Sequence, residues 1–186
     1  MSLNRILNIP ALLWLAACAS MPAPIPLALR SSDDFSLSGR VVVRQGDRAE
    51  VLRISWSHSG VEDRAHLETT LGQTVAEISL GDQGGSAILA DGRHLAEEND
   101  AELARQLIGI PLPLHRFADW VRARSASGER GTTSHPLANF EDSGWTLAYQ
   151  GWGEAPGGEQ LPALIDARRG DLSVRLRVEK WSQGTP

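Results

Sequence analysis

Apolar and polar residues alternate along most of the chain after residue 34, which is the pattern of strands with one buried face. The clearest case is the segment 172–181, where four aliphatic residues alternate with Ser, Arg, Arg and Glu. In the segment 50–59, Leu52, Ile54 and Trp56 likewise share one face. The same reasoning predicts strands at 37–44, 74–80, 86–90, 144–152 and 160–169.

The apolar spacing changes to a helical period in the middle of the chain. Asn99 is typical of a helix N-cap, with Glu102 three residues later, and Gly109 is typical of a helix end. Pro111 and Pro113 then separate this helix from a second one over the apolar residues that follow.

Strands, two inserted helices and strands again predict a mainly β, α+β fold, with a polar loop over 124–144. We expect a curved antiparallel sheet whose concave side is covered by the helices. Because the inward positions are Val, Leu, Ile and Trp, such a sheet can enclose an apolar cavity. The candidate cavity-lining residues are Val41, Val43, Leu52, Ile54, Trp56, Leu107 and Trp120.

The stretch 66–78 predicts two strands joined by a tight turn, with Leu71 and Gly72 at the bend. Exposed turns are normally polar, so an aliphatic side chain at the tip needs an explanation. Leu71 could pack against a neighbouring loop or a partner protein, or it could insert into a membrane. The turn residues alone do not choose between these interpretations.

The N-terminal residues differ from the rest of the chain. Residues 1–17 begin with a short polar stretch carrying Arg5 and then run apolar, as a secretory signal peptide does. The stretch 15–18, Leu-Ala-Ala-Cys, is typical of a bacterial lipobox, in which Cys18 receives a diacylglyceryl group and later an N-acyl chain. An uncleaved signal anchor and a plain signal peptide with an incidental cysteine are the alternatives.

We therefore predict three segments: a lipoprotein signal peptide over 1–17, a lipid-anchored tether over 18–34 and one folded domain over 35–186. Three alternating prolines favour an extended tether. Ala19 after the cysteine, rather than Asp, predicts export to the outer membrane, with the domain facing the periplasm.

Composition removes several classes of function. The net charge of −5 at pH 7 gives no electrostatic support for a nucleic-acid partner. The single cysteine and the five scattered histidines predict neither an internal disulfide nor a metal site. The sequence contains no nucleotide-phosphate loop and no nucleophile turn, so we expect no enzyme.

Taken together, these features resemble the LolB family of outer-membrane lipoprotein receptors, from Phe35 to Trp181. The resemblance rests on the order of six stretches rather than on any one of them: FSLSGRVVV, ISW, LETTLGQTVAEI, LIGIPLPLHRFADWV, GWTLAYQGW and LRVEKW. It implies an incomplete, strongly curved antiparallel β-barrel with a helical lid over an apolar cavity.

The resemblance also implies a function without catalysis. Members of the family accept acylated lipoproteins from the periplasmic carrier LolA and release them into the inner leaflet of the outer membrane without nucleotide hydrolysis. The implied partners are LolA, lipoprotein cargo and outer-membrane lipid. We expect a monomer with no cofactor other than the acyl groups on Cys18. In the family, the turn that corresponds to Leu71 and Gly72 touches the membrane during release.

Some features depart from the family pattern. Thr70 stands where family members often have proline, which makes the turn less stiff. The segment before Phe35 is short, and the loop after Trp120 differs from the usual one. The alternative function is that of an outer-membrane lipoprotein that binds a small apolar ligand or lipid in the same cavity.

Overall fold

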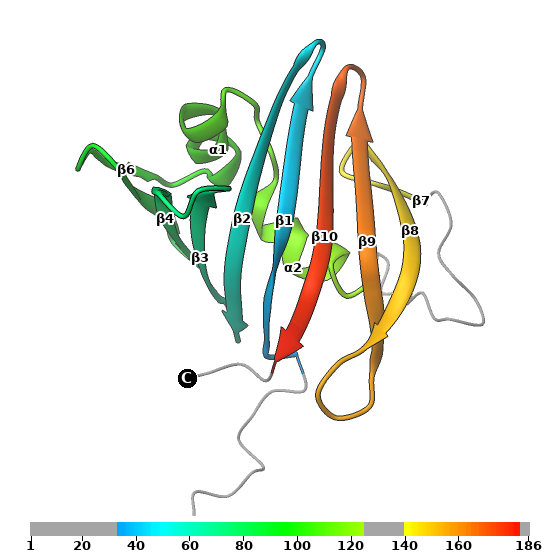
Figure 1. The fold of residues 1–186 in the computed structure, drawn as a ribbon. Coiled ribbons are helices and arrows are strands. Elements are labelled where there is room, and N and C mark those ends of the chain that lie inside the picture. The colour runs from blue at the N-terminus through cyan, green and yellow to red at the C-terminus, as the bar shows by residue number, and fades with distance from the viewer. Residues whose placement is uncertain (1–32, 125–139, 183–186) are drawn as a thin grey trace, which may run out of the picture.

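The computed structural model describes residues 33–124 and 140–182. Within these residues, ten strands form one antiparallel sheet in the order β6-β5-β4-β3-β2-β1-β10-β9-β8-β7, which curves around two helices on its concave side (Figure 1). The predicted mainly β fold with a curved, open antiparallel sheet is confirmed. The strands are β1 (Phe35–Gln45), β2 (Arg48–Ser59), β3 (Glu62–Thr69), β4 (Thr74–Gly81), β5 (Gly84–Leu89), β6 (His94–Glu97), β7 (Phe140–Asp142), β8 (Trp145–Glu154), β9 (Gln160–Arg169) and β10 (Leu172–Ser182). The helices are α1 (Asp100–Ile108) and α2 (Leu114–Trp120).

The connectivity leaves the sheet open. Each strand pairs with the next one in the chain, except that β6 and β7 are the edges of the sheet and that β1 also pairs with β10. The β1–β10 pairing contains a bulge between Ser38 and Gly39. A Cβ atom at Gly39 would lie 2.1 Å from the carbonyl oxygen of Arg177, so glycine is required for this close approach. Such bulges bend and twist a strand, which helps to curve the centre of the sheet.

Helix α1 begins and ends where the sequence predicts. Oδ1 of Asn99 accepts hydrogen bonds from the backbone N–H groups of Ala101 (2.9 Å) and Glu102 (3.4 Å). At the other end, Gly109 has φ +76°, and its N–H donates to the carbonyl oxygen of Arg105 (2.9 Å). In the part of the chain that the structure describes, no helix is long and apolar enough to cross a membrane.

The inward positions of the long central strands form the core, as the alternating pattern predicts. Trp145 and Leu147 extend this core into β8, and both are fully buried. The buried inward residues of β1, β2 and β10 include Phe35, Leu37, Val41, Leu52, Trp56, Val174, Leu176 and Val178.

The turns between the strands lie at different positions relative to the end of the sheet at which β1 begins. The β1–β2 and β9–β10 turns lie at one end, and the start of β1 and the end of β10 lie at the other (Figure 1). Thr69, the last residue of β3, pairs with Leu52, whereas Phe35 pairs with His58 at the far end of β2. The β3–β4 turn therefore lies away from the end at which β1 begins.

Two short strands are missed by the sequence pattern. β6 has four residues, too few for alternation to stand out, and β7 has three residues inside the stretch 124–144 that predicts a loop. β7 forms because its residues add to the edge of β8. Most of that stretch, 125–139, lies outside the described residues, as do Cys18, the predicted signal peptide and almost all of the predicted tether.

Candidate functional site

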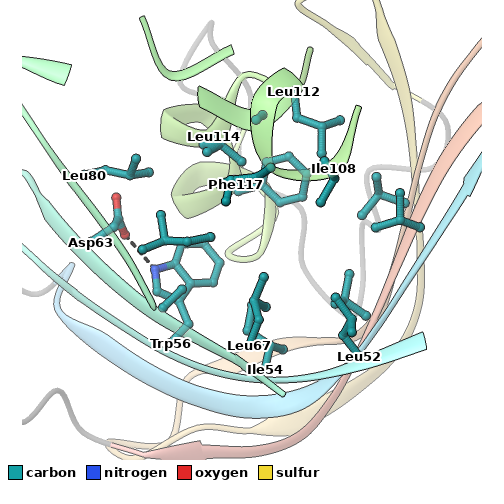
Figure 2. A pocket seen from close by; sticks show the side chains of 17 residues that line it. Leu52, Ile54, Trp56, Asp63, Leu67, Leu80, Ile108, Leu112, Leu114 and Phe117 are labelled. Carbon is teal, nitrogen blue, oxygen red and sulfur yellow. Dashed lines mark hydrogen bonds between the residues drawn. The ribbon is translucent and has the colours of Figure 1, made fainter. Parts of the chain in front are cut away.

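An apolar cavity of about 120 Å³ lies between the concave face of the sheet and the two helices (Figure 2). The helical side consists of Ala104, Leu107, Ile108, Leu112, Leu114 and Phe117. Leu112, Leu114 and Phe117 lie across the cavity from the labelled residues of β2 and β3 (Figure 2). Every described side chain in the lining is apolar except that of Asp63.

The sheet side of the cavity follows from strand register. Val41 pairs with Leu52 between β1 and β2, and Ile54 pairs with Leu67 between β2 and β3. Directly paired residues point to the same face of a sheet, and so does every second residue along each strand. One alternating pattern repeated in neighbouring strands therefore gathers these side chains on the concave side.

Asp63 lies in the cavity wall and is only 7% exposed. Its Oδ1 accepts a hydrogen bond from Nε1 of Trp56 (2.8 Å) and lies 2.9 Å from Nδ1 of His58. His58 pairs directly with Asp63 across β2 and β3, and Trp56 lies two residues away on the same face. Phe35 stacks on the His58 ring with 5.2 Å between centroids. The hairpin thus provides one buried carboxylate oxygen with two polar neighbours.

Helix α2 is held against the sheet edge by buried polar contacts. Trp120 donates from Nε1 to Oδ2 of Asp142 (2.9 Å), and Arg116 donates from Nε to the same oxygen (3.1 Å). Burial opposes the charge on Asp142, but hydrogen bonds from Arg116, Trp120 and Ser143 outweigh it and hold the pKa of this carboxyl below its usual value. The carboxylate is therefore charged at neutral pH and binds the helix.

The residues that follow α2 bind to the start of the described chain. Arg122 donates from Nη1 to the carbonyl oxygen of Asp33 (2.9 Å), and Arg124 donates from Nη2 to the Asp33 carboxylate (2.6 Å). The Arg122 guanidinium also lies 5.4 Å from the centre of the Phe35 ring. Burial, together with the neighbouring Arg124, lowers the pKa of Arg122. These contacts fix the end of α2 against the first strand.

The β3–β4 turn presents Leu71, which is 86% exposed. The N–H of Thr69 donates to the carbonyl oxygen of Gln73 (2.8 Å), and the N–H of Gly72 donates to that of Thr69 (3.0 Å). The loop therefore contains Thr70, Leu71 and Gly72, one residue more than the two-residue turn that the sequence suggests. Gly72 has φ +81°, the left-handed conformation that such three-residue loops require.

The structure brings most of the predicted cavity residues together. Those found in the lining are Val41, Val43, Leu52, Ile54, Trp56 and Leu107. Trp120 is absent from the lining, which corrects its predicted role. It is 1% exposed, and its ring packs against those of Phe117 and Trp145 with centroids 4.9 and 6.1 Å away. Its indole N–H needs a buried acceptor, and Asp142 supplies one at the sheet edge.

Sequence reasoning missed Asp63 and part of the apolar lining. The available signal for Asp63 was a carboxylate shortly after the strand that carries Trp56 and His58, at a position that the β2–β3 pairing places directly opposite His58 and diagonal to Trp56. Leu112 lies between two prolines, in a segment with no regular period to show which way it points. Across residues 33–124 and 140–182, no group of three His, Cys, Asp or Glu side chains could hold a metal ion.

An open, curved antiparallel sheet with an apolar cavity beneath two helices has the architecture of a site suited to apolar ligands. The family model described as outer membrane lipoprotein LolB matches residues 33–181. The chain is similar to the outer-membrane lipoprotein LolB of Chromobacterium violaceum, with 32% identity over 96% of this chain and 99% of that protein. It is also similar to the proteins of the same name from Azoarcus sp. (30% identity, 90% of this chain and 89% of that one) and Dechloromonas aromatica (30%, 91% and 92%). The chain belongs to the LolB family of outer-membrane lipoproteins, which confirms the resemblance.

Proposed function

We propose that this protein accepts acylated lipoproteins from the carrier LolA and inserts them into the inner leaflet of the outer membrane, without nucleotide hydrolysis. Membership of the LolB family supports a role in localising lipoproteins to the outer membrane. The observation that carries the proposal is the cavity beneath α1 and α2, whose described lining is apolar apart from one carboxylate.

Acyl chains require such a cavity when they leave a membrane. Each exposed methylene costs about 0.8 kcal/mol, so a lipoprotein with three acyl chains needs cover between the two membranes. Transfer from carrier to receptor to bilayer then requires only that each successive site binds the chains more tightly. About 1.4 kcal/mol gives each tenfold bias, and no covalent bond has to be made or broken.

The cavity has to widen before it can take several acyl chains. Its volume of about 120 Å³ lies below the roughly 300–1,000 Å³ of sites that hold drug-sized ligands. The side-chain hydrogen bonds that join α1 to its neighbours, Gln106 to Glu97 and His115 to Asp100, are exposed, so the apolar packing of Leu103 and Ala104 is what holds α1 against the sheet. No buried polar contact like those of α2 resists its movement among the described residues. We propose that α1 moves away from the sheet about Gly109, while the buried contacts of α2 persist.

Two further features support contact with the membrane. The predicted acyl groups on Cys18 would anchor the chain in the outer membrane. Leu71 presents an apolar side chain at the tip of a turn, and it is the most exposed large hydrophobic residue in the described part of the chain. An uncovered leucine on a fixed turn suits insertion among lipid chains, so we propose that Leu71 enters the bilayer during release.

The test follows a labelled lipoprotein from its LolA complex to the receptor and on to outer-membrane vesicles. Wild type is compared with Leu71→Glu and with Val61→Glu. Val61 is 59% exposed in the β2–β3 turn at the other end of the sheet, so it receives the same new charge at a matched site.

We expect wild type and Val61→Glu to accept and deliver cargo, and Leu71→Glu to accept cargo but retain it. Failure of the wild type to accept cargo from LolA would overturn the proposal. Release by Leu71→Glu at the wild-type rate would remove the membrane role from Leu71.

The volume of the cavity as it stands favours a second candidate function, the binding of a small apolar ligand or lipid. Lipid that co-purifies with the protein, together with no uptake of lipoprotein from LolA, would support this function over the first.

A further inference from the structure

We propose that Asp63 is the polar contact of the cavity, and that its carboxylate accepts a hydrogen bond from an amide N–H at the polar end of the bound acylated chain. This inference rests on the proposed function and adds to it a side chain that distinguishes cargo with an amide N–H from lipids without one. An apolar wall alone can select ligands only by the length and number of their acyl chains.

The carboxylate of Asp63 is buried, yet only one of its oxygens is bonded. Both polar neighbours, Trp56 and His58, lie at Oδ1. Among the described residues, no side-chain or backbone donor is bonded to Oδ2. A carboxylate has room for about four donors, and Oδ2, unlike the fully enclosed polar atoms that lack a partner, is not sealed from solvent. Oδ2 is therefore available to a donor that arrives with a ligand.

The position of Asp63 fits this role, because it lies where the cavity meets the outside of the domain. Asp63 and Leu80 line the cavity and also two outer grooves. Figure 2 shows both residues at one side of the cavity, with the apolar side chains gathered beyond them. The grooves outside are polar; Glu62, Arg64 and Glu97 line one of them, and His115 lines the other. An amphipathic ligand with its chains inside would place its polar end at Asp63.

The polar end of an acylated lipoprotein carries the matching donor. Its diacylglyceryl group offers only ester oxygens, which are acceptors and gain nothing from a carboxylate. The amide that joins the third acyl chain to the terminal nitrogen carries an N–H, as do the peptide bonds that follow. A carboxylate at the mouth of the cavity therefore favours an acylated peptide over a triacylglycerol with the same three chains.

The test needs a chain without its own acyl groups. A chain that begins at Ala19 lacks the predicted signal peptide and Cys18 and keeps all of the described residues, 33–124 and 140–182. Three probes with identical palmitoyl chains are compared: an N-palmitoyl, S-dipalmitoylglyceryl cysteine dipeptide, the same compound methylated at both of its amide nitrogens, and tripalmitoylglycerol. Quenching of tryptophan fluorescence measures each dissociation constant, because Trp56 lies in the cavity wall.

We expect wild type to bind the N–H probe about tenfold more tightly than its N-methyl analogue. In Asp63→Asn, which keeps the shape of the side chain but not its charge, we expect this preference to fall to about threefold or less. His58→Gln is the matched control, because it alters the neighbour of Oδ1 and leaves the carboxylate; we expect it to keep the preference.

Each result decides between the possibilities. Equal affinity of wild type for the N–H and N-methyl probes would overturn the inference, even if Asp63→Asn failed to fold. An unchanged preference in Asp63→Asn would confine Asp63 to holding Trp56 and His58 in place. Failure of wild type to bind any of the three probes would instead count against the proposed function.

Discussion

Trp120 and Asp142 join the second helix to the edge of the sheet through one hydrogen bond, 2.9 Å from the indole Nε1 to Oδ2. The two residues lie on either side of the stretch 125–139 in the chain. Arg116 donates to the same carboxylate oxygen, so a single buried acid holds α2 by two of its side chains. The helical cover of the cavity is therefore firmly attached at α2.

We predict that Asp142→Asn lowers the free energy of unfolding by about 2 kcal/mol at pH 7, because the charge-assisted bonds from Arg116 are lost. The pKa of Asp142 is lower in the folded protein than in the unfolded chain. Its stabilisation is therefore fully present above the unfolded pKa near 3.9 and is lost as the pH falls through the folded pKa. Urea unfolding of both proteins between pH 7 and pH 3 measures this effect. A difference that stayed constant over that range would contradict the prediction.

We predict that Gly39→Ala destabilises the protein by about 3 kcal/mol, because the new methyl group would meet the carbonyl oxygen of Arg177 in the β1–β10 pair. Gly153→Ala in β8 is the control, since a Cβ atom there has no described neighbour within 4 Å. We expect the control to change stability by less than about 1 kcal/mol. Denaturant unfolding compares the two variants, and similar losses in both would argue against a tight contact at Gly39.

We predict that Ala65→Leu weakens the binding of an apolar fluorescent probe about tenfold, because the larger side chain occupies part of the cavity. The free energy of unfolding should change by less than about 1 kcal/mol, since the added atoms enter space that is already open. Ala49→Leu adds the same atoms at an exposed position of β2 outside the lining. Equal affinities in the two variants would show that the probe binds elsewhere.

We predict that Leu71→Glu reduces the partitioning of the unlipidated chain into phospholipid vesicles by about tenfold or more, because burial of a leucine contributes about 2 kcal/mol. Leu71→Met, which keeps an apolar side chain, should retain most of the binding. Thermal unfolding should not distinguish the variants, because Leu71 is 86% exposed. Co-sedimentation with vesicles provides the measurement, and undiminished binding of Leu71→Glu would contradict the proposed insertion.

Much of the fold could be predicted because the pattern of apolar residues and the residues at the element ends indicate the strands and the helix that form. The strand around Trp56 and the strand from Leu172 show their buried faces in every second residue. Both ends of the first helix are indicated by the sequence, through Asn99 as the N-cap and Gly109 as the left-handed residue after the helix. β6 and β7 could not be predicted, because strands of four and three residues exist only by pairing with a longer neighbour.

The candidate site was predictable where it depends on the pattern of a single strand. Leu52 and Ile54 line the cavity because inward positions of a strand can be read from alternation. Asp63 was missed because its environment is set by cross-strand pairing with His58 rather than by its own segment. Trp120 was misplaced because its partner, Asp142, lies beyond a long polar stretch, and no local pattern indicates that distant acceptor.

The position of Leu71, away from the end of the sheet where β1 begins, bears on how an anchored molecule could work. Thr69 pairs with Leu52 and Phe35 pairs with His58, and these two partners lie six residues apart along β2, or roughly 20 Å. Residues 18–33 can span at most about 50 Å, so a chain anchored at Cys18 can still lower Leu71 onto the same leaflet. Insertion of Leu71 then becomes an intramolecular event. The length of the tether sets the effective concentration of Leu71 at the membrane surface, and this concentration is high. A tether trimmed to less than about a third of its length would keep the molecule anchored but hold Leu71 out of reach of the lipid.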